Sequence, residues 1–307
     1  MRIRIGFAGF ALFLMSAAAC AETCSHLLFV SGYFSNNVAV FDACNGTYVR
    51  QLEVEGRIQG AQAVRYNPAD DLIYVVSEGN DQIQRYRRTP DYAFVDVFAQ
   101  LAITVDPTGI DFGIHHEVYV AGYATSSVVE LDRISGAQIG VVLPSSSGLL
   151  GADNGMMVSA TGLIYVPGYD SSSVARINPL TSQVQAQFIA SGTAGIFNSR
   201  GIVDEGTTIL VGGEGSGAVY RFDAGSGALV QTLISGLVHP TGLAIAPDGS
   251  LLVLAGNRVR RYDRTTGASL GIFANPLDGG ISGGTFLALV PNPAADPIFA
   301  DGFDEGS

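Results

Sequence analysis

Residues 239–263 read HPTGLAIAPDGSLLVLAGNRVRRYD and contain three short apolar runs separated by polar turns. GLAIAP begins at Gly242, LVLAG ends at Gly256 and VRRYD ends at Asp263. Runs of five or six residues rich in Val, Leu, Ile and Tyr, bounded by turn residues, are typical of β-strands. The stretch therefore predicts three consecutive antiparallel strands.

The same unit occurs six times along the chain. The runs equivalent to LVLAG end at Gly32, Ser77, Gly122, Gly168, Gly213 and Gly256, 43 to 46 residues apart. Each is followed by a polar turn and another strand, and four of those strands end in an Asp with Gly four residues later, a common turn device. Four short antiparallel strands in a repeat of this length are typical of a propeller blade. The sequence therefore predicts an all-β, six-bladed β-propeller.

The phase of the repeat predicts how the ring closes. The first blade begins with its second strand, and the last repeat is followed by one additional strand, GTFLALV from Gly284. We expect this C-terminal strand to complete the N-terminal blade, because closure removes the free edges of the sheets.

Three segments resemble the NHL and YVTN repeats of bacterial six- and seven-bladed propellers. They are HPTGLAIAPDGSLLVLAG from His239, DPTGIDFGIHHEVYVAGY from Asp106 and SNNVAVFD from Ser35. The likeness covers residues 26–290. Because such propellers serve as binding scaffolds, lactonases, lyases and sensor domains, the resemblance implies the fold more than the function. The chain has no Trp, which argues against Trp-Asp repeats and quinoprotein blades.

The N-terminus has the three parts of a secretory signal. MRIRIG is followed by the apolar FAGFALFLMSAAA and by CAETC. We expect cleavage after Ala21, so that the chain divides into a signal peptide (1–21), the propeller (22–293) and an acidic tail (294–307). Lipidation at Cys20 is the alternative. The protein is expected to be exported, to the periplasm or outside the cell, and the residues do not define the role of the tail segment IFADGFD.

Two cysteines remain after the predicted cleavage, Cys24 and Cys44. Paired cysteines in an exported protein are usually oxidised. Cys24 precedes the second strand of its blade and Cys44 follows the third, so both lie at the same end of the sheet. We therefore predict a disulfide between them.

Composition excludes several classes of function. The chain has 28 acidic and 16 basic residues, a formal net charge of -12, and every basic residue is Arg. Schiff-base chemistry needs Lys and is therefore excluded. Nucleic acid binding relies on dense positive charge, so this composition argues against a nucleic acid partner. After the signal, no apolar run is long enough for a membrane-spanning helix, and we expect a monomer.

Ligand sites in propellers lie around the central channel, on the loops that lead into first strands and on the turns between second and third strands. We predict that ligand-binding side chains come from these segments. They are Glu78, Asp106, Tyr123, Asp153, Asn154, Tyr169, Arg200 and His239.

Asp106, Asp153 and Asn154 also suggest a metal site. Oxygen ligands suit calcium or another divalent cation, and gluconolactonase-type propellers hold such an ion. The Glu and Asn ligands of that family cannot be placed one by one on this sequence, so no ligand is carried over.

Two functions follow from these features. The first is a binding or interaction scaffold whose channel-facing loops hold a small molecule, a glycan or a protein. The alternative is a metal-dependent hydrolase or lactonase, which would use the cation predicted above. The sequence does not decide whether the protein is an enzyme.

Overall fold

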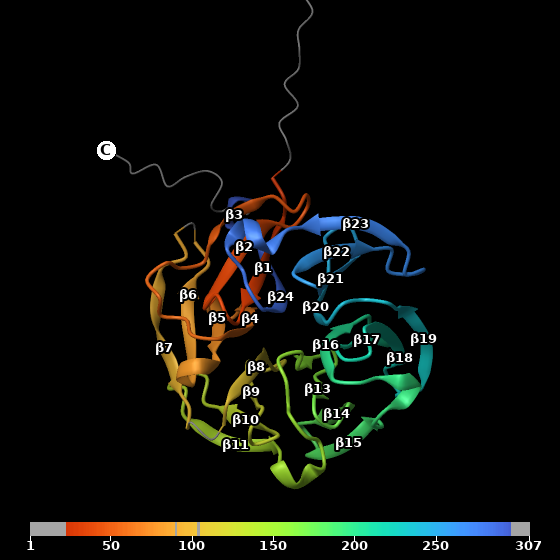
Figure 1. The fold of residues 1–307 in the computed structure, drawn as a ribbon. Helices are drawn as coiled ribbons and strands as arrows, with labels where there is room; N and C mark the ends of the chain where they lie inside the picture. Colours follow the sequence, from red (N-terminus) through yellow and green to blue (C-terminus); the bar gives the residue numbers. More distant parts are fainter. Residues whose placement is uncertain (1–22, 90, 103–104, 296–307) are drawn as a thin grey trace, which may run out of the picture.

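The computed structural model describes residues 23–89, 91–102 and 105–295. The predicted signal peptide and most of the predicted acidic tail lie outside the described residues. Within them the chain forms six four-stranded antiparallel sheets, arranged as a ring around a central axis (Figure 1). The six-bladed β-propeller is confirmed.

Each blade has a first strand near the axis and a fourth strand at the rim. Blade 1 contains β24 (Gly284–Pro291), β1 (His26–Gly32), β2 (Asn37–Asp42) and β3 (Tyr48–Gln51). Blade 2 contains β4 (Ala61–Asn67), β5 (Leu72–Ser77), β6 (Gln82–Arg87) and β7 (Phe94–Gln100). Blade 3 contains β8 (Pro107–Phe112), β9 (Val118–Gly122), β10 (Ser127–Leu131) and β11 (Gln138–Leu143).

The other three blades follow the same order. Blade 4 contains β12 (Met157–Val158), β13 (Ile164–Gly168), β14 (Ser173–Asn178) and β15 (Gln183–Ile189). Blade 5 contains β16 (Ser199–Asp204), β17 (Thr208–Gly213), β18 (Ala218–Asp223) and β19 (Leu229–Ile234). Blade 6 contains β20 (Pro240–Ile245), β21 (Leu251–Ala255), β22 (Arg258–Tyr262) and β23 (Ser269–Ala274).

Helical structure among the described residues is limited to short 3₁₀ turns. They are η1 (Glu78–Asn80), η2 (Ser145–Ser147), η3 (Thr193–Gly195), η4 (Pro276–Gly279) and η5 (Pro293–Ala295). In this part of the chain no helix has the length and apolar character needed to cross a membrane.

Blade 1 is assembled from two distant parts of the chain. β24 pairs antiparallel with β1 from His26↔Pro291 to Gly32↔Gly284. In Figure 1 the blue β24 lies beside the red β1. Asn292 extends the junction, because its backbone N–H donates to Ser25 O and its Nδ2 donates to Cys24 O.

The predicted disulfide is present in the same blade. Cys24 and Cys44 are joined, with their Cα atoms 5.8 Å apart. Cys24 directly precedes β1 and Cys44 lies in the turn between β2 and β3. The bond therefore connects two neighbouring segments at one end of blade 1, as predicted.

The core lies between neighbouring blades. The second strands are almost wholly buried, whereas most residues of the fourth strands β3, β15 and β23 are exposed or half-buried. Large buried side chains such as Phe29, Phe41, Tyr74 and Phe222 fill the interfaces between sheets. Blade faces are therefore apolar, and polar side chains can gather only at the axis, on the rim and at the two ends of the ring.

Blade 4 departs from the predicted pattern. The run GMMVS begins at Gly155 in the sequence, but β12 spans only Met157–Val158, and Ala152 forms an isolated bridge with Gly168. Gly151 adopts a left-handed φ of 65°, and the Asp153 carboxylate accepts the N–H of Asn154 at 2.6 Å. This local turn takes the place of the first residues of the strand.

Candidate functional site

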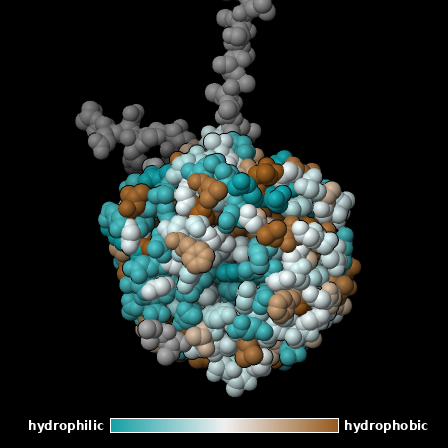
Figure 2. All heavy atoms as spheres, in the orientation of Figure 1, coloured by the Kyte–Doolittle hydropathy of each residue, from teal (hydrophilic) through white to brown (hydrophobic). Residues whose placement is uncertain are grey.

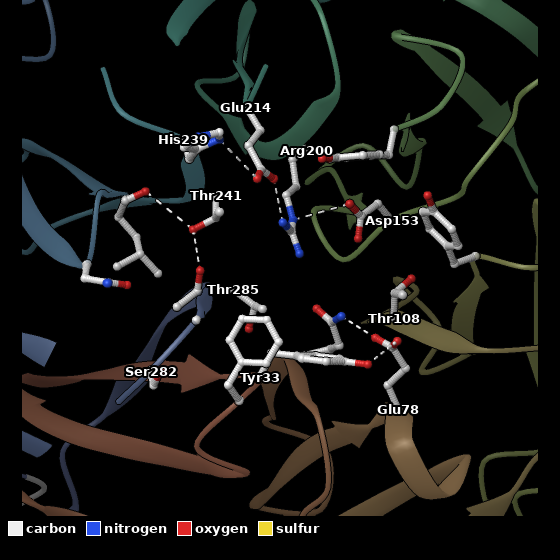
Figure 3. A pocket seen from close by; sticks show the side chains of 18 of the residues that line it. Tyr33, Glu78, Thr108, Asp153, Arg200, Glu214, His239, Thr241, Ser282 and Thr285 are labelled. Atoms are coloured by element: carbon white, nitrogen blue, oxygen red, sulfur yellow. Dashed lines mark hydrogen bonds and ion pairs between the residues drawn. The ribbon is translucent and has the colours of Figure 1, made fainter. Parts of the chain in front are cut away.

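A cavity of about 760 Å³ lies at the end of the channel where first strands begin and second strands end. The side chains or backbone of 21 residues form its wall: Tyr33, Phe34, Gln62, Glu78, Asp106, Thr108, Tyr123, Asp153, Tyr169, Arg200, Glu214, Val238, His239, Thr241, Leu254, Gly256, Asn257, Ser282, Gly283, Gly284 and Thr285. Figure 3 shows side chains from many parts of the ring converging on this space. Figure 2 shows one face of the molecule with a mostly hydrophilic depression at its middle and scattered hydrophobic residues around it.

The first set of lining residues, which we name the turn ring, comes from the turns after the second strands. Each blade contributes the residue that directly follows its second-strand run, the run equivalent to LVLAG in the sequence. The members are Tyr33, Glu78, Tyr123, Tyr169, Glu214 and Asn257, and all six line the cavity. In five blades the residue three positions later has a left-handed φ between 51° and 61°, as at Asn36 and Ser126. In blade 6 a two-residue turn, Gly256 and Asn257, takes its place. One repeated turn geometry therefore presents five of the six side chains.

The second set, the strand ring, comes from the start of the first strands. Its members are Gln62, Thr108, Asn154, Arg200, Thr241 and Thr285. All except Asn154 line the cavity. In four blades the next residue is Gly, and an added Cβ there would meet the neighbouring blade. At Gly155 it would lie 1.8 Å from Arg200 O, and at Gly242 2.9 Å from Leu287 N. Glycine therefore lets the first strands approach one another around the axis.

The threonines of the strand ring join adjacent blades. Thr108 Oγ1 donates to Ala152 O at 2.9 Å, Thr241 Oγ1 to Gly284 O at 2.9 Å, and Thr285 Oγ1 to Ala61 O at 2.8 Å. In each case the acceptor belongs to the segment leading into the next first strand. These bonds satisfy buried carbonyl groups and hold the wall of the cavity in place.

The channel is crossed beneath the cavity. Asn154 Nδ2 donates to Thr285 O at 3.1 Å, which joins blade 4 to the opposite blade 1. The same amide group donates to Gln62 Oε1 of blade 2 at 2.8 Å. Three residues after Gln62 on β4, Arg65 Nη2 of blade 2 donates to Met156 O of blade 4 at 3.1 Å. Contacts between non-adjacent blades pass through the axis, so the cavity ends as a closed cup.

One wall of the cup holds an ion-pair network around Arg200. Arg200 Nη1 donates to Glu214 Oε2 at 2.6 Å, and its Nε lies 3.3 Å from Asp153 Oδ2 (Figure 3). Burial raises the pKa of the Asp153 carboxyl, and Arg200 opposes that rise. His239 Nδ1 lies 3.7 Å from Glu214 Oε1, and the His239 side chain is 73% exposed. The Arg200 charge is therefore compensated inside the protein.

The facing wall holds carboxylates without a compensating cation. Glu78 Oε1 accepts from the Tyr33 hydroxyl at 3.2 Å, and its Oε2 accepts from Gln62 Nε2. Burial, with a smaller contribution from the Asp106 charge, raises the pKa of Glu78 to about 7. Burial and the neighbouring Asp81 also raise the pKa of Asp106. Among the described residues, neither carboxylate forms an ion pair with Arg or His.

The structure brings seven of the eight predicted ligand-binding residues into this one cavity. They are Glu78, Asp106, Tyr123, Asp153, Tyr169, Arg200 and His239. The eighth, Asn154, has no exposed surface and lies in the contacts that close the cup. No sequence pattern indicates this inward orientation of Asn154, because it depends on a hydrogen bond to the opposite blade.

The predicted metal ligands are only partly placed together. Asp106 and Asp153 line the same cavity, but Asp153 is already paired with Arg200 and Asn154 is buried below them. A cation at Asp153 would meet the Arg200 guanidinium, which opposes its binding. In the described part of the chain, one group of three His, Cys, Asp or Glu side chains has ligand atoms within 4.8 Å of one another, and it is the disulfide pair with Asp42. The metal site stays a prediction.

Sequence reasoning missed the contribution of blade 1. Tyr33 and Thr285 line the cavity, as do Phe34 and residues 282–284. The register of the repeat was sufficient to find Tyr33, because it occupies the position of Glu78 and Tyr123 in the following blades. The contribution of blade 1 to the cavity was harder to predict, because the strands of this blade come from both ends of the propeller sequence.

Comparison with known proteins supports the fold. No family model and no curated protein matches the chain, so the NHL and YVTN resemblance stays a prediction. A chain in the crystal structure of a nidogen/laminin complex superposes with a TM-score of 0.71 at 11% identity, over 86% of this chain and 97% of that one.

Two bacterial structures are also similar. A protein of unknown function from Bacteroides caccae gives a TM-score of 0.63 at 16% identity, over 87% of this chain and 99% of its own. A gluconolactonase from Xanthomonas campestris gives 0.61 at 15% identity, over 89% and 94%. At these identities the likeness shows the fold alone, and all three comparisons agree with a six-bladed β-propeller.

Proposed function

We propose that this protein is an exported binding protein that holds a glycan in the cup at the mouth of its propeller channel. The observation that carries the proposal is the cavity of about 760 Å³, lined by aromatic rings, carboxylates and amides. Its volume falls in the usual range for small-molecule sites. A cup closed below by contacts between opposite blades suits a ligand that enters and leaves at one end.

The chemistry of the wall favours a polyhydroxylated ligand. Tyr33, Tyr123 and Tyr169 offer apolar ring faces to the C–H faces of a sugar, with few rotatable bonds to restrain. The carboxylates of Glu78 and Asp106 accept hydrogen bonds from hydroxyl groups. Four carboxylates and one guanidinium line the cavity, which disfavours phosphorylated and carboxylated ligands.

The disulfide supports the exported location. Cys24 and Cys44 are joined in the structure, and such bonds persist in oxidising compartments outside the cytosol. The apolar segment that precedes Cys20 in the sequence supports the same location.

A metal-dependent hydrolase is the second candidate. The observation that favours the hydrolase is that Asp106 and Asp153 line one cavity. The pairing of Asp153 with Arg200 argues against a metal site there. Metal content of the purified protein, measured by mass spectrometry, separates the two functions when combined with thermal melts. The binding protein predicts a melt unchanged by chelator. A stoichiometric divalent ion, with a melting temperature lowered by chelator, would favour the hydrolase.

Isothermal titration calorimetry with a panel of neutral and amine-bearing trisaccharides tests the glycan proposal. We expect one-to-one binding of at least one trisaccharide, weakened about tenfold or more by Tyr123→Ala, because an aromatic contact is lost. Tyr48→Ala is the matched control, since Tyr48 lies on the rim strand β3. Absence of binding by the whole panel would overturn the proposal, as would equal effects of the two substitutions.

A further inference from the structure

We infer that the glycan carries a protonated amine, and that this amine sits against Glu78 and Asp106. The inference rests on the proposed function and adds the chemical class of the ligand, an amino sugar. It follows from the two unlike walls of the cup, from the two donors that already point at Glu78, and from the aromatic rings that line the same cavity.

The two walls differ in charge compensation. Asp153 and Glu214 share Arg200, and His239 Nδ1 lies 3.7 Å from Glu214 Oε1, so each carboxylate of that wall already has a basic partner. Glu78 and Asp106 line the same cavity, and no Arg or His of the described residues pairs with them. The whole chain lacks Lys, so no lysine side chain can neutralise them. Figure 3 shows Glu78 and Arg200 on opposite sides of the open space.

Unpaired carboxylates inside a cavity are costly, because burial and mutual repulsion both disfavour their ionised forms. Burial and the Asp106 charge raise the pKa of Glu78. Burial and the Asp81 charge raise the pKa of Asp106, while its hydrogen bond with Glu78 opposes that rise. A ligand ammonium group between the two would compensate their charge and recover the electrostatic energy. The Tyr33 and Tyr123 rings that line the same cavity add favourable cation–π contacts.

An ammonium group fits this wall better than a metal ion. Gln62 Oε1 is occupied by Asn154 Nδ2, so Gln62 turns its N–H₂ group, a donor, toward Glu78. Tyr33 also donates to that carboxylate. Calcium takes six to eight oxygen ligands and would meet two hydrogen-bond donors here. An ammonium group needs only lone pairs that remain on the Glu78 and Asp106 carboxylates.

Two trisaccharides that differ only in their amino groups test the inference. They are tri-glucosamine and its fully N-acetylated counterpart. At pH 6.5 we expect tri-glucosamine to bind about 10- to 100-fold more tightly in calorimetric titrations, the range for a desolvated charge pair. The Glu78→Gln/Asp106→Asn variant should lose most of this preference, so that its affinity falls about tenfold or more further for tri-glucosamine than for the acetylated sugar.

The control variant removes the same charge elsewhere. Asp91→Asn/Glu117→Gln changes two carboxylates in turns at the opposite end of the blades, and it should keep the full preference for tri-glucosamine. Thermal melts verify that each variant is folded, and Glu78→Gln alone is used if the double variant is not.

The outcomes separate the two proposals. Equal affinity of the wild-type protein for both sugars would overturn the amine inference and leave the glycan proposal standing. A preference that survives in Glu78→Gln/Asp106→Asn would also overturn it, because the amine would then bind elsewhere. Failure of every trisaccharide to bind would overturn the glycan proposal itself.

Discussion

At the scale of single residues, Arg200 offsets part of the negative charge of the cup. It is the one cation among the lining residues besides the exposed His239, and it contacts both Asp153 and Glu214. Its guanidinium also lies 5.8 Å from the centre of the Tyr169 ring. The buried Asp153 therefore depends on Arg200 for its ionised form.

Replacing this cation is expected to destabilise the protein. Arg200→Gln leaves Asp153 and Glu214 without their partner, and breaking a buried pair in this way typically costs about 3–5 kcal/mol. Urea unfolding followed by circular dichroism measures the change. The control is Arg133→Gln at an exposed position, expected to change the free energy of unfolding by less than about 0.5 kcal/mol. A loss below about 1 kcal/mol in Arg200→Gln would show that the network is not structural.

Glu78 is expected to make stability depend on pH. Its pKa in the folded protein is about 7, above the ordinary value of 4.5, so folding favours the protonated form. Its contribution to stability is complete below pH 4.5 and is lost as pH rises through 7. Thermal melts from pH 4.5 to 8 should show wild type losing stability relative to Glu78→Gln across this window. A constant difference between the two proteins would contradict the raised pKa.

At the scale of elements, the approach of one first strand to the next depends on a residue without a side chain. Gly155 lies before β12, and a Cβ there would be 1.8 Å from Arg200 O of blade 5. The neighbouring atom is backbone, so the blades themselves would have to separate. Because Asn154 directly precedes Gly155, this close approach of Gly155 to Arg200 also sets the positions of Asn154 and Arg200, two members of the strand ring.

Gly155→Ala is therefore expected to destabilise the protein by more than about 2 kcal/mol, as overpacking against a fixed backbone does. Gly140→Ala on the rim strand β11 is the matched control. Its added methyl group would lie 3.5 Å from Glu130 Oε2, an ordinary contact. Chemical denaturation of both variants measures the difference. Similar stability for the two would mean that the first strands tolerate wider spacing than this structure has.

The sequence predicted the elements well because strand periodicity is local. Each second strand, its turn and the following strand occupy about fifteen consecutive residues, so the turn ring members Glu78, Tyr123 and Tyr169 share one repeat position. The short β12 was not predictable in this way, since it depends on the turn at Gly151 and on the blade 5 backbone beside Gly155.

The site was predictable as a set of positions but not as a set of contacts. The repeat register brings Asp153, Arg200 and Glu214 to one end of the ring. Which carboxylate each nitrogen of Arg200 meets depends on side-chain rotamers that no repeat encodes. The buried position of Asn154 depends on Thr285, 131 residues away and in the opposite blade.

At the scale of the whole molecule, the ring is held where its two ends meet. β24 and β1 form one sheet, Asn292 bonds to Ser25 and Cys24, and Cys24 is joined to Cys44. The disulfide thus anchors the segment that receives the C-terminal strand. Because Thr285 on β24 also reaches blades 2 and 4 through its backbone and side chain, this junction supports the floor of the cup.

Removing the disulfide is expected to loosen this junction and lower global stability. Cys24 and Cys44 are 20 residues apart, and a cross-link over a loop of this size restricts the unfolded chain enough to stabilise the fold by about 3 kcal/mol. Cys24→Ser/Cys44→Ser should therefore melt several degrees below the oxidised wild type. Wild type that is reduced and alkylated is the control and should melt with the variant. An unchanged melting temperature in both would mean that strand pairing between β24 and β1 closes the ring without the covalent bond.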